Sequence, residues 1–576
     1  MALKKIKIGN VSISEAMSKN LAYVDKTKFI ELLENDSRTD VPVFLRPRRF
    51  GKTFFTFALF NYYDKSQEAK FEQNFKGTWI YSHKTTMASS YYCLRFDFSS
   101  VSPSPAKVEG SVADEIAGGL SGFSSRYPEL GLPESKLDPR LYESPSGLMK
   151  AFLNNFVNHA KNGERLFIII DEYDHFANDL LSSDREAFRE ITSTAQEHEG
   201  FVKQFYATLK QFYGGNDLAP IERFFITGVS AVSLDSLVSG FNIATNISTY
   251  PMYNAMAGFT HEELSKLVDE TIDFQCLAPV TKGDLMSAME RYYDGYSFSK
   301  NVQERIFNSN MCLVFLAEVQ MTGAIPQNMP GNDGDDAARL DGMLKLADQE
   351  ICNDISDKIF LRGDIVGKEP GSLNLNRSDA FNPDQLTWML YYMGYLTMSA
   401  GDGATKYRCP NEIAYQAFAD YLAGRELFGA KRSGDLTAIL QHGDVAGLAR
   451  EAEKPLAQLP DAAFSGFNER SVQLCFHYVI KGQAEGVAES FPEADTGDHG
   501  RVDLYVKNKT GGPDLLLEFK YISKSKADDA RIAKALAEAK AQLERYKASP
   551  RFKKIWNLKA CALIFVGPKA QRIEEV

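Results

Sequence analysis

The sequence is poor in long apolar runs. None of its 576 residues lies in a stretch approaching the roughly 18 apolar residues that a membrane-spanning helix needs, and the longest runs, such as 166–170, have the length of a strand. The first ten residues contain lysines but no apolar core and no small-residue cleavage site, so we expect no signal peptide. These absences predict a cytoplasmic protein without a membrane partner.

Disulfide and zinc frameworks are equally unsupported. The seven cysteines are scattered along the chain, and no two stand at the C-x-x-C spacing of a zinc or redox motif. We expect them to behave as small buried hydrophobes in a reducing compartment. With 44% apolar and 24% charged residues, the composition is that of a globular protein, and the length suffices for several domains.

The chain also lacks an overall positive charge. Its 65 basic and 76 acidic residues give a net charge of −11, which argues against a nucleic-acid binder with a uniformly basic surface. The charge is unevenly distributed, however, because twelve basic residues and only four acids lie between Phe519 and Ala560. This segment fits a polyanionic ligand, although a solvated helix face would have the same composition.

Short apolar segments separated by helical patterns occupy the first half of the chain, at 41–46, 91–98, 166–170 and 223–229. This alternation predicts a parallel sheet in an α/β fold. The pattern then becomes mainly helical. Thr260 and Glu263 stand at the offset of a capping box, and an acidic loop rich in Gly and Pro at 326–336 interrupts the helices.

A second α/β unit is expected after Phe467, with a helix, two strands joined by a turn, a charged helix and a strand at 560–566. The resulting division has three parts. We predict a parallel-sheet domain at 1–258, a helical middle domain at 259–460 and a smaller α/β domain at 461–576.

The segment from Arg46 to Thr53 predicts a phosphate-binding loop. It follows a strand and opens a helix, and Gly51, Lys52 and Thr53 match the end of the pattern GxxxxGK[ST]. Such a loop, which here includes Arg49, directs backbone N–H groups, a lysine and a hydroxyl at the phosphates and Mg²⁺ of a nucleotide such as ATP. Arg46 replaces the first Gly, so the alternative is a solvated basic turn.

The strand at 166–170 ends in two acids and predicts the second half of a nucleotide site. Asp171 would hold Mg²⁺ directly or through water, and Glu172 would polarise the attacking water. Thr227, at the end of the strand at 223–229, is a candidate contact to the γ-phosphate. For each of these residues the alternative is an ordinary polar strand end.

A hairpin near the C-terminus predicts a metal-dependent nuclease site. Glu518 and Lys520 share one face of its second strand because side chains alternate, and Asp503 on the first strand can lie beside them. Two carboxylates can hold Mg²⁺ or Mn²⁺, and the ammonium can orient or activate a water and offset charge on a phosphodiester. This is the PD-(D/E)xK arrangement; the alternative is a charge pair on the surface of an edge hairpin.

Together these motifs resemble a bacterial family with an N-terminal AAA-ATPase-like domain of the P-loop class and a C-terminal PD-(D/E)xK nuclease domain with a restriction-endonuclease-like fold. The co-linear matches are Tyr23–Lys26, Arg46–Thr53, Asp171–Asp174, Thr227–Val229, Asp294–Tyr296, Pro410–Glu412, Gly500–Asp503 and Glu518–Lys520. The family tolerates a non-Gly residue at the start of its phosphate loop.

The resemblance implies roles for individual residues. Lys52 and Thr53 would be nucleotide ligands, Asp171 and Glu172 the Walker B acids, and the nuclease triad would be Asp503, Glu518 and Lys520. The family's upstream acid could be Glu469 or Glu489. Gln542 and Tyr546 match the family's Gln-x-x-x-Tyr and share a helix face, from which they would approach the metal or only pack on the sheet.

The function predicted from these residues is a Mg²⁺-dependent nuclease acting on nucleic acid, expected to be DNA, coupled to a module that binds ATP. Two alternatives remain open. One is a catalytically silent, ATP-regulated binding or switch protein that recognises nucleic acid or a protein, and the other is an NTPase whose C-terminal domain only grips nucleic acid. The sequence leaves a homo-oligomer open.

Overall fold

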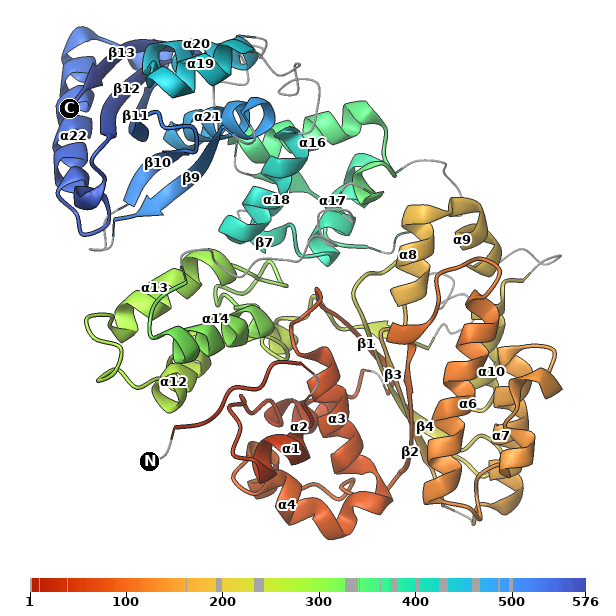
Figure 1. Cartoon of the computed structure of the whole chain (residues 1–576). Coiled ribbons are helices and arrows are strands. Elements are labelled where there is room, and N and C mark those ends of the chain that lie inside the picture. The colour runs from red at the N-terminus through yellow and green to blue at the C-terminus, as the bar shows by residue number, and fades with distance from the viewer. Residues whose placement is uncertain are drawn as a thin grey trace. The chain divides into compact units, whose positions relative to one another are not determined.

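The structure is a computed structural model that divides into two compact units (Figure 1). The first contains residues 1–348 and 366–413, and the second contains residues 349–365 and 414–576. The three-domain division of the sequence stays a prediction. The residues that the structure describes are 3–9, 11–38, 40–161, 163–192, 199–232, 243–326, 340, 342–362, 364–371, 373, 381–399, 404–423, 434–457, 467–484, 487–496 and 501–576.

The first unit is built on the predicted parallel sheet. Its five strands stand in the order β2 (Tyr92–Asp97), β3 (Leu166–Asp171), β4 (Ile221–Gly228), β1 (Pro42–Leu45) and β5 (Thr245–Asn246). All four pairings are parallel. Every residue of β1 and β3 is buried, as expected for strands covered on both faces.

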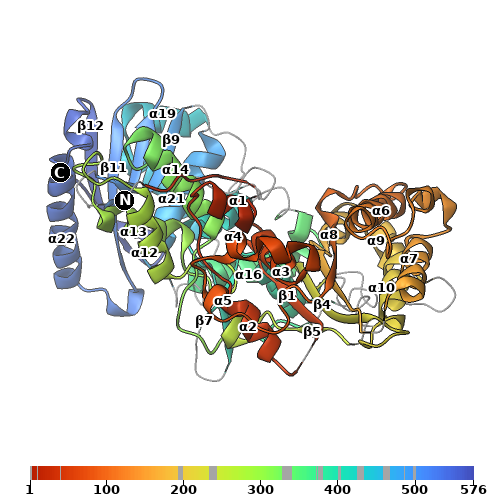
Figure 2. The same ribbon diagram turned by 90° about the horizontal axis from the view of Figure 1, so that it is seen from below.

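Helices cover both faces of this sheet. One layer contains α2 (Lys28–Asn35) and α3 (Lys52–Tyr63), and the opposite layer contains α6 (Val108–Arg126), α7 (Pro145–His159) and α10 (Phe201–Gln211) (Figures 1 and 2). The strand order places β4 between β1 and β3. The phosphate loop after β1, Thr227 in β4 and the acids at the end of β3 therefore lie at one edge of the sheet.

The helical middle is confirmed. Three helices, α12 (His261–Thr271), α13 (Lys282–Tyr293) and α14 (Ser309–Thr322), share one apolar core. Thr260 and Glu263 form the expected capping box at the start of α12. A three-stranded sheet of β6 (Ile365–Gly367), β8 (Thr405–Arg408) and β7 (Thr397–Ser399) was not predicted. The predicted loop at 326–336 lies, after its first residue, outside the described residues.

The second unit contains a five-stranded sheet in the order β13–β12–β11–β10–β9 (Figure 1). β10 (Arg501–Asn508), β11 (Asp514–Ile522) and β12 (Leu558–Val566) were expected. The edge strands β9 (Ala488–Asp495) and β13 (Lys569–Glu575) were missed. Only the β11–β12 pair is parallel, and α22 (Asp529–Lys547) connects its two strands.

Two apolar cores lie on opposite faces of this sheet. On one face the core includes residues of α19 (Gly434–His442), α20 (Val445–Leu456) and α21 (Glu469–Gln483). On the other face the core includes Ala539, Leu543 and Tyr546 of α22. In the described part of the chain, no helix combines the length and apolar character needed to cross a membrane. All seven cysteines are free thiols, and five of them are buried.

Candidate functional site

The phosphate loop turns through two residues with left-handed backbone. Arg49 has a φ of 69° and Gly51 a φ of 91°; Gly51 is the residue before α3 and pays no steric penalty there. The Arg49 carbonyl accepts hydrogen bonds from the Asn310 N–H (3.1 Å) and the Ser309 hydroxyl (3.2 Å). The start of α14 therefore braces the loop, and Lys52 and half-buried Thr53 open α3.

Arg46, which replaces the first glycine of the pattern, is a buried anchor. Its guanidinium donates to the carbonyls of Ser248 (2.8 Å) and Tyr253 (2.9 Å) and lies over the rings of Phe44 and Phe298, at 4.3 and 4.0 Å. Burial lowers the pKa of Arg46 to about 9, so the group is still charged at neutral pH. The alternative of a solvated basic turn is therefore wrong for this position.

Lys52 is buried against its own loop. Its Nζ donates to the carbonyls of Arg46 (3.1 Å) and Pro47 (3.4 Å) and lies 3.2 Å from Glu172 Oε1. Glu172 itself has a left-handed backbone, with a φ of 52°. A bound phosphate would therefore compete with the Glu172 carboxylate for the lysine.

Asp171 is fully buried and only half satisfied. Its Oδ2 accepts from Thr56 Oγ1 (3.2 Å) and from Arg95 (3.1 Å), whereas Oδ1 has no partner. Burial, with the nearby charges of Glu172 and Asp97, raises the pKa of Asp171 to about 6. Thr56 and Arg95 were not predicted, although Thr56 lies one turn after the Thr53 of the motif.

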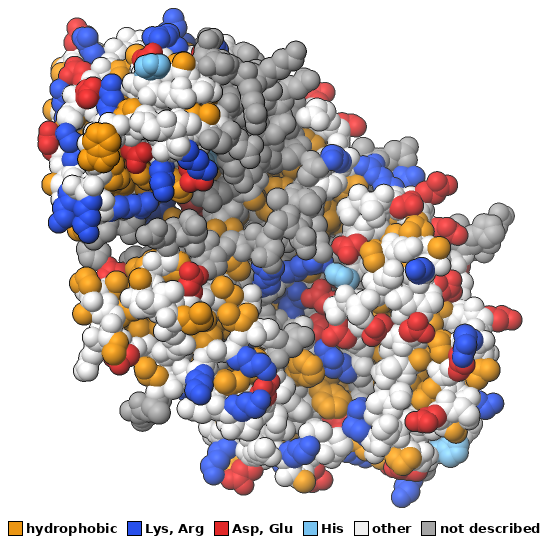
Figure 3. Space-filling model, viewed as in Figure 1, with side chains coloured by type: hydrophobic (Ala, Val, Ile, Leu, Met, Phe, Trp, Pro, Cys, Tyr) orange, Lys and Arg blue, Asp and Glu red, His pale blue; other side chains and the backbone are white. Residues whose placement is uncertain are grey.

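Thr227 provides a second unsatisfied polar group at the same edge of the sheet. Its hydroxyl is buried without a partner, on the strand next to the one that carries Asp171. Carboxylate and hydroxyl oxygens suit Mg²⁺, and the N-terminus of α3 suits phosphate. The residues present therefore fit a magnesium nucleotide. Basic and acidic side chains lie side by side near the centre of the face in Figure 3.

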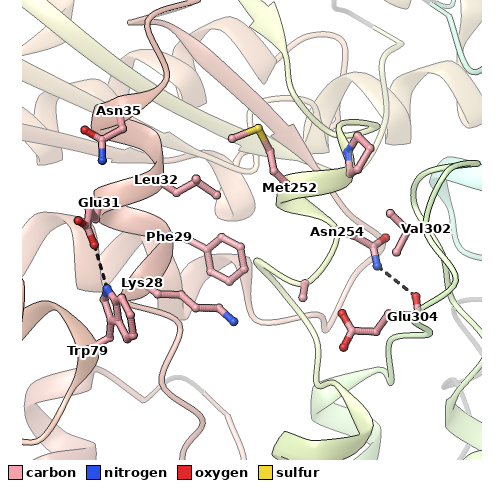
Figure 4. Close-up of a pocket in the computed structure, with 12 residues that line it drawn as sticks. Lys28, Phe29, Glu31, Leu32, Asn35, Trp79, Met252, Asn254, Val302 and Glu304 are labelled. Carbon is pink, nitrogen blue, oxygen red and sulfur yellow. Dashed lines mark hydrogen bonds between the residues drawn. The ribbon is translucent and has the colours of Figure 1, made fainter.

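The first unit also has a pocket of about 400 Å³ between α2, Trp79 and the segment 251–255 (Figure 4). Asn254 lines it, and the carbonyl of this residue accepts a hydrogen bond from Arg46 (3.5 Å). None of the predicted nucleotide residues lines this pocket.

In the second unit, the structure brings the three predicted nuclease residues together. Lys520 Nζ lies 3.1 Å from Glu518 Oε1 on the same face of β11. Asp503 Oδ2, on β10, accepts from the Phe519 N–H at 2.7 Å. The regular pairing of β10 with β11 ends at Leu504. Beyond that point the Asp503 carboxylate, instead of a backbone carbonyl, accepts the hydrogen bond from the Phe519 N–H.

The charges of this cluster favour a cation. Glu518 is buried, and its Oε2 has no partner. Burial raises the pKa of Glu518 against the opposing effect of Lys520. Burial alone would lower the pKa of Lys520, but the carboxylates of Glu518, Glu469 and Asp503 outweigh it, so the net shift is upward. Lys520 is thus an ammonium at neutral pH.

These residues fit Mg²⁺ or Mn²⁺. Two carboxylates, one with an unsatisfied buried oxygen, are a hard-cation donor set that backbone carbonyls and water can complete. The described residues contain no cluster of three or more acidic, His or Cys side chains arranged to hold a metal. Any ion would therefore depend on Asp503 and Glu518 for its protein charge.

The two candidates for the upstream acid are placed differently. Glu469 begins α21, and its Oε2 lies 3.6 Å from Lys520 Nζ. Glu489 pairs with Lys509 and stands opposite Lys507, four residues along β10 from the 503 position, or about 13 Å. The structure brings Glu469 to the cluster and keeps Glu489 away from it.

Tyr546 packs in the apolar core beneath α22, near the charges of the cluster. It is buried on α22, and its pKa is raised by burial and by the charges of Glu518 and Asp503. Gln542 lies one turn earlier and is half-buried. Gln473 was not predicted, but its amide donates to the Asp503 carbonyl from α21, one turn after Glu469.

Acidic residues of β13 partly neutralise the basic segment between Phe519 and Ala560. Lys540 pairs with Glu574 (2.5 Å), Lys559 pairs with Glu575 (3.2 Å), and Lys547 donates to the Val576 carbonyl (2.7 Å). These acids lie on β13, beyond the segment in which the charges were counted. The count therefore overstates the positive charge that is free to meet a polyanion.

Comparison with known proteins gives the class of the chain. Residues 7–238 match the family model of a predicted AAA-ATPase, and residues 475–575 match that of the PD-(D/E)XK nuclease superfamily. The chain therefore carries a match to an AAA-ATPase-like domain followed by a match to a PD-(D/E)XK nuclease-type domain, in the order that its motifs predict.

One curated relative is an uncharacterized protein in the vnfD 5′ region of Azotobacter chroococcum mcd 1. It is 26% identical over 304 residues, which are 52% of this chain and 50% of that protein. The aligned part of the chain thus spans about half the length of the relative.

Proposed function

We propose that this protein is a Mg²⁺- or Mn²⁺-dependent nuclease that hydrolyses phosphodiester bonds of DNA in the cytoplasm, and that an ATP-binding module in the same chain controls it. One observation carries the proposal. The buried Glu518 carboxylate, with one oxygen unpartnered, lies beside the Lys520 ammonium and next to Asp503 across the β10–β11 pair.

In this proposal Asp503 and Glu518 hold the divalent cation, which supplies Lewis acidity and a more acidic bound water. Lys520 is held as an ammonium by its three acidic neighbours. It therefore orients the attacking water and offsets charge on the phosphodiester rather than accepting a proton. Glu469 limits the movement of Lys520 from the other side, at 3.6 Å.

The N-terminal residues have matching roles at the nucleotide. Lys52 and Thr53 would hold the phosphates and their metal, Asp171, whose Oδ1 is unpartnered, would help to hold Mg²⁺, and Thr227 would lie near the γ-phosphate. Because Lys52 and Glu172 form an ion pair, phosphate that binds Lys52 would release the carboxylate of Glu172. The freed carboxylate can then polarise water.

A cleavage assay tests the proposal. Full-length protein is incubated with plasmid DNA, single-stranded DNA and RNA, with Mg²⁺ or Mn²⁺, and with or without ATP. Metal-dependent DNA cleavage that Asp503→Asn removes would support it. ATP turnover without cleavage of any substrate would instead favour an NTPase whose second domain only grips nucleic acid, and neither activity would favour the silent switch protein.

A further inference from the structure

Trp556, in the connection between α22 and β12, is 94% exposed and is the most exposed large hydrophobic side chain among the described residues. An isolated apolar side chain on a surface is ordinary. An indole, however, has a large flat face and forms its strongest contacts when it is covered. The surroundings of Trp556 indicate what covers it.

The loop 551–557 is fixed on the sheet at both ends. At its start the Arg551 N–H donates to the Thr496 carbonyl (3.2 Å), and the buried Phe552 ring lies 5.1 Å from that of Tyr505. At its end the Asn557 carbonyl accepts from the Asp514 N–H (2.9 Å). The loop is thus held in place although Trp556 itself has no role in the core.

These anchors hold the loop on the strands that carry the nuclease cluster, with its Asn557 end four residues along β11 from Glu518. Tyr505 lies two residues after Asp503 on β10, and its hydroxyl donates to Asp514 (2.6 Å). Asp514 stands four residues before Glu518 on β11, a distance of about 13 Å along the strand. That distance equals about four stacked nucleotide steps of roughly 3.4 Å.

The loop also carries free positive charge. Lys553 and Lys554 are exposed, and within the described residues neither forms an ion pair. Other lysines of the basic segment are paired with β13. An exposed aromatic ring beside unpaired cations is the combination with which proteins hold single-stranded nucleic acid, through base stacking and phosphate neutralisation.

We infer that the loop 551–557 is a nucleic-acid-binding surface in which Trp556 stacks on an unpaired base and Lys553 and Lys554 contact phosphates. The inference rests on the proposed nuclease function. It holds that the nucleic-acid strand on one side of the cleaved bond continues onto this loop. Bases inside a duplex do not expose their faces, so the surface selects single strands, ends or flaps over continuous duplex.

Binding without cleavage tests the inference. Full-length protein in EDTA is titrated against fluorescein-labelled DNA of about 20 nucleotides, single-stranded or duplex, with anisotropy as the readout. Trp556→Ala should weaken single-strand binding by about tenfold, while Trp556→Phe stays within about threefold of the unmodified protein because it keeps a stacking face. The matched control is Leu218→Ala, which truncates another exposed apolar side chain (80% exposed) and should change nothing.

A salt titration separates the two contributions. The double variant Lys553→Ala/Lys554→Ala should lower the slope of log affinity against log salt by about 1 to 2, whereas Trp556→Ala should leave the slope unchanged. All variants should melt at the temperature of the unmodified protein, because the altered side chains are exposed. Equal loss of slope in the Trp556→Ala variant would overturn the assignment of stacking.

The outcomes distinguish this inference from the proposed function. If Trp556→Ala weakens binding but no metal supports cleavage, the nuclease proposal fails and the surface stands. If cleavage occurs and Trp556→Ala binds and cleaves like the unmodified protein, the surface is overturned and the nuclease stands. Absence of any nucleic-acid binding overturns the inference. If Trp556→Ala changes only self-association in sedimentation, the inference is also overturned, and the loop is a contact between proteins.

Discussion

The two candidate sites contain the same pair of groups, a buried carboxylate with one unpartnered oxygen and a nearby lysine, but they use the lysine differently. Asp171 Oδ1 and Glu518 Oε2 are the unpartnered oxygens, and burial raises the pKa of both residues. Lys52 is bonded to its own loop and to Glu172. Lys520 instead lies among carboxylates that keep it charged.

The local charge balance explains what each site requires. In the C-terminal cluster the carboxylates of Asp503 and Glu518 can face a cation, while Glu469 lies beside Lys520 and offsets the charge of that lysine. In the N-terminal site, Arg95 bridges Asp171 and Asp97, and Lys52 pairs with Glu172. The C-terminal site is therefore suited to a metal ion alone, and the N-terminal site to a metal that arrives with the phosphates of a nucleotide.

The largest effect is expected from Asp503→Asn. This variant removes a negative ligand but keeps an acceptor for the Phe519 N–H, so the fold should persist while metal-dependent cleavage falls by about 1,000-fold or more. Single-turnover cleavage of plasmid DNA and the thermal shift produced by Mn²⁺ measure the effect. Lys52→Ala serves as the control and should keep the Mn²⁺ shift. An unchanged cleavage rate in Asp503→Asn would remove the distinction between the two sites.

Lys52→Ala should raise the dissociation constant for ATP by about 100-fold, because the phosphates lose their buried cation. Glu172→Gln should bind ATP at least as tightly as the unmodified protein, since it frees Lys52 from an ion pair, while slowing any hydrolysis. Calorimetric titration with ATP and Mg²⁺ measures both. If the two variants lose affinity equally, Lys52 and Glu172 act as one structural pair and not as competitors.

The predicted residues that the structure brings together are those whose relation is local. Glu518 and Lys520 share a face because strands alternate, and Gly51 and Lys52 meet at a helix start. The fold class followed from the same kind of periodicity, but the edge strands β9 and β13 were missed.

Partners from distant segments could not be predicted. Arg46 was taken for a departure from the phosphate-loop pattern, yet it is bound by Ser248 and Phe298, about 200 residues or more away. The choice between Glu469 and Glu489 likewise depends on where α21 begins relative to β11. Such partners are set by the packing of whole elements, which no local pattern encodes.

Asp171→Asn should change how stability depends on pH. The folded pKa of Asp171 is about 6, above its ordinary value of 3.8, so the folded state binds the proton more tightly than the unfolded state. The protonated Asp171 therefore contributes to the free energy of unfolding below about pH 4, and this contribution is lost as the pH rises through 6. Without metal or nucleotide, Asp171→Asn should therefore be the more stable protein by about 3 kcal/mol at pH 7.5.

Denaturant melts at pH 5 and pH 7.5 measure this effect, and the difference between the variants should shrink at the lower pH. Asp217→Asn, which alters a largely exposed carboxylate, is the control and should show no such change. Equal pH dependence in Asp171→Asn and the unmodified protein would mean that Arg95 and Thr56 fully offset the burial of the charge.

The smallest expected effect separates the two candidate upstream acids. Glu469→Gln removes one of the carboxylates beside Lys520 and should slow cleavage by about fivefold, because the ammonium is held less firmly and loses about 1 kcal/mol of favourable interaction. Glu489→Gln breaks only the pair with Lys509 and should leave the rate within about twofold. The two variants are matched, since both neutralise a half-exposed glutamate that pairs with a lysine in the same unit.

Single-turnover rates at saturating metal compare the two variants under identical conditions. The loss in Glu469→Gln should disappear in a Lys520→Ala background, because the carboxylate acts through the lysine. An equal loss in that background would instead assign Glu469 a direct contact with metal or water. A larger loss of cleavage rate in Glu489→Gln than in Glu469→Gln would contradict the placement of α21 at the cluster. It would also contradict the view that the acidic side chains of the C-terminal site come from three separate elements.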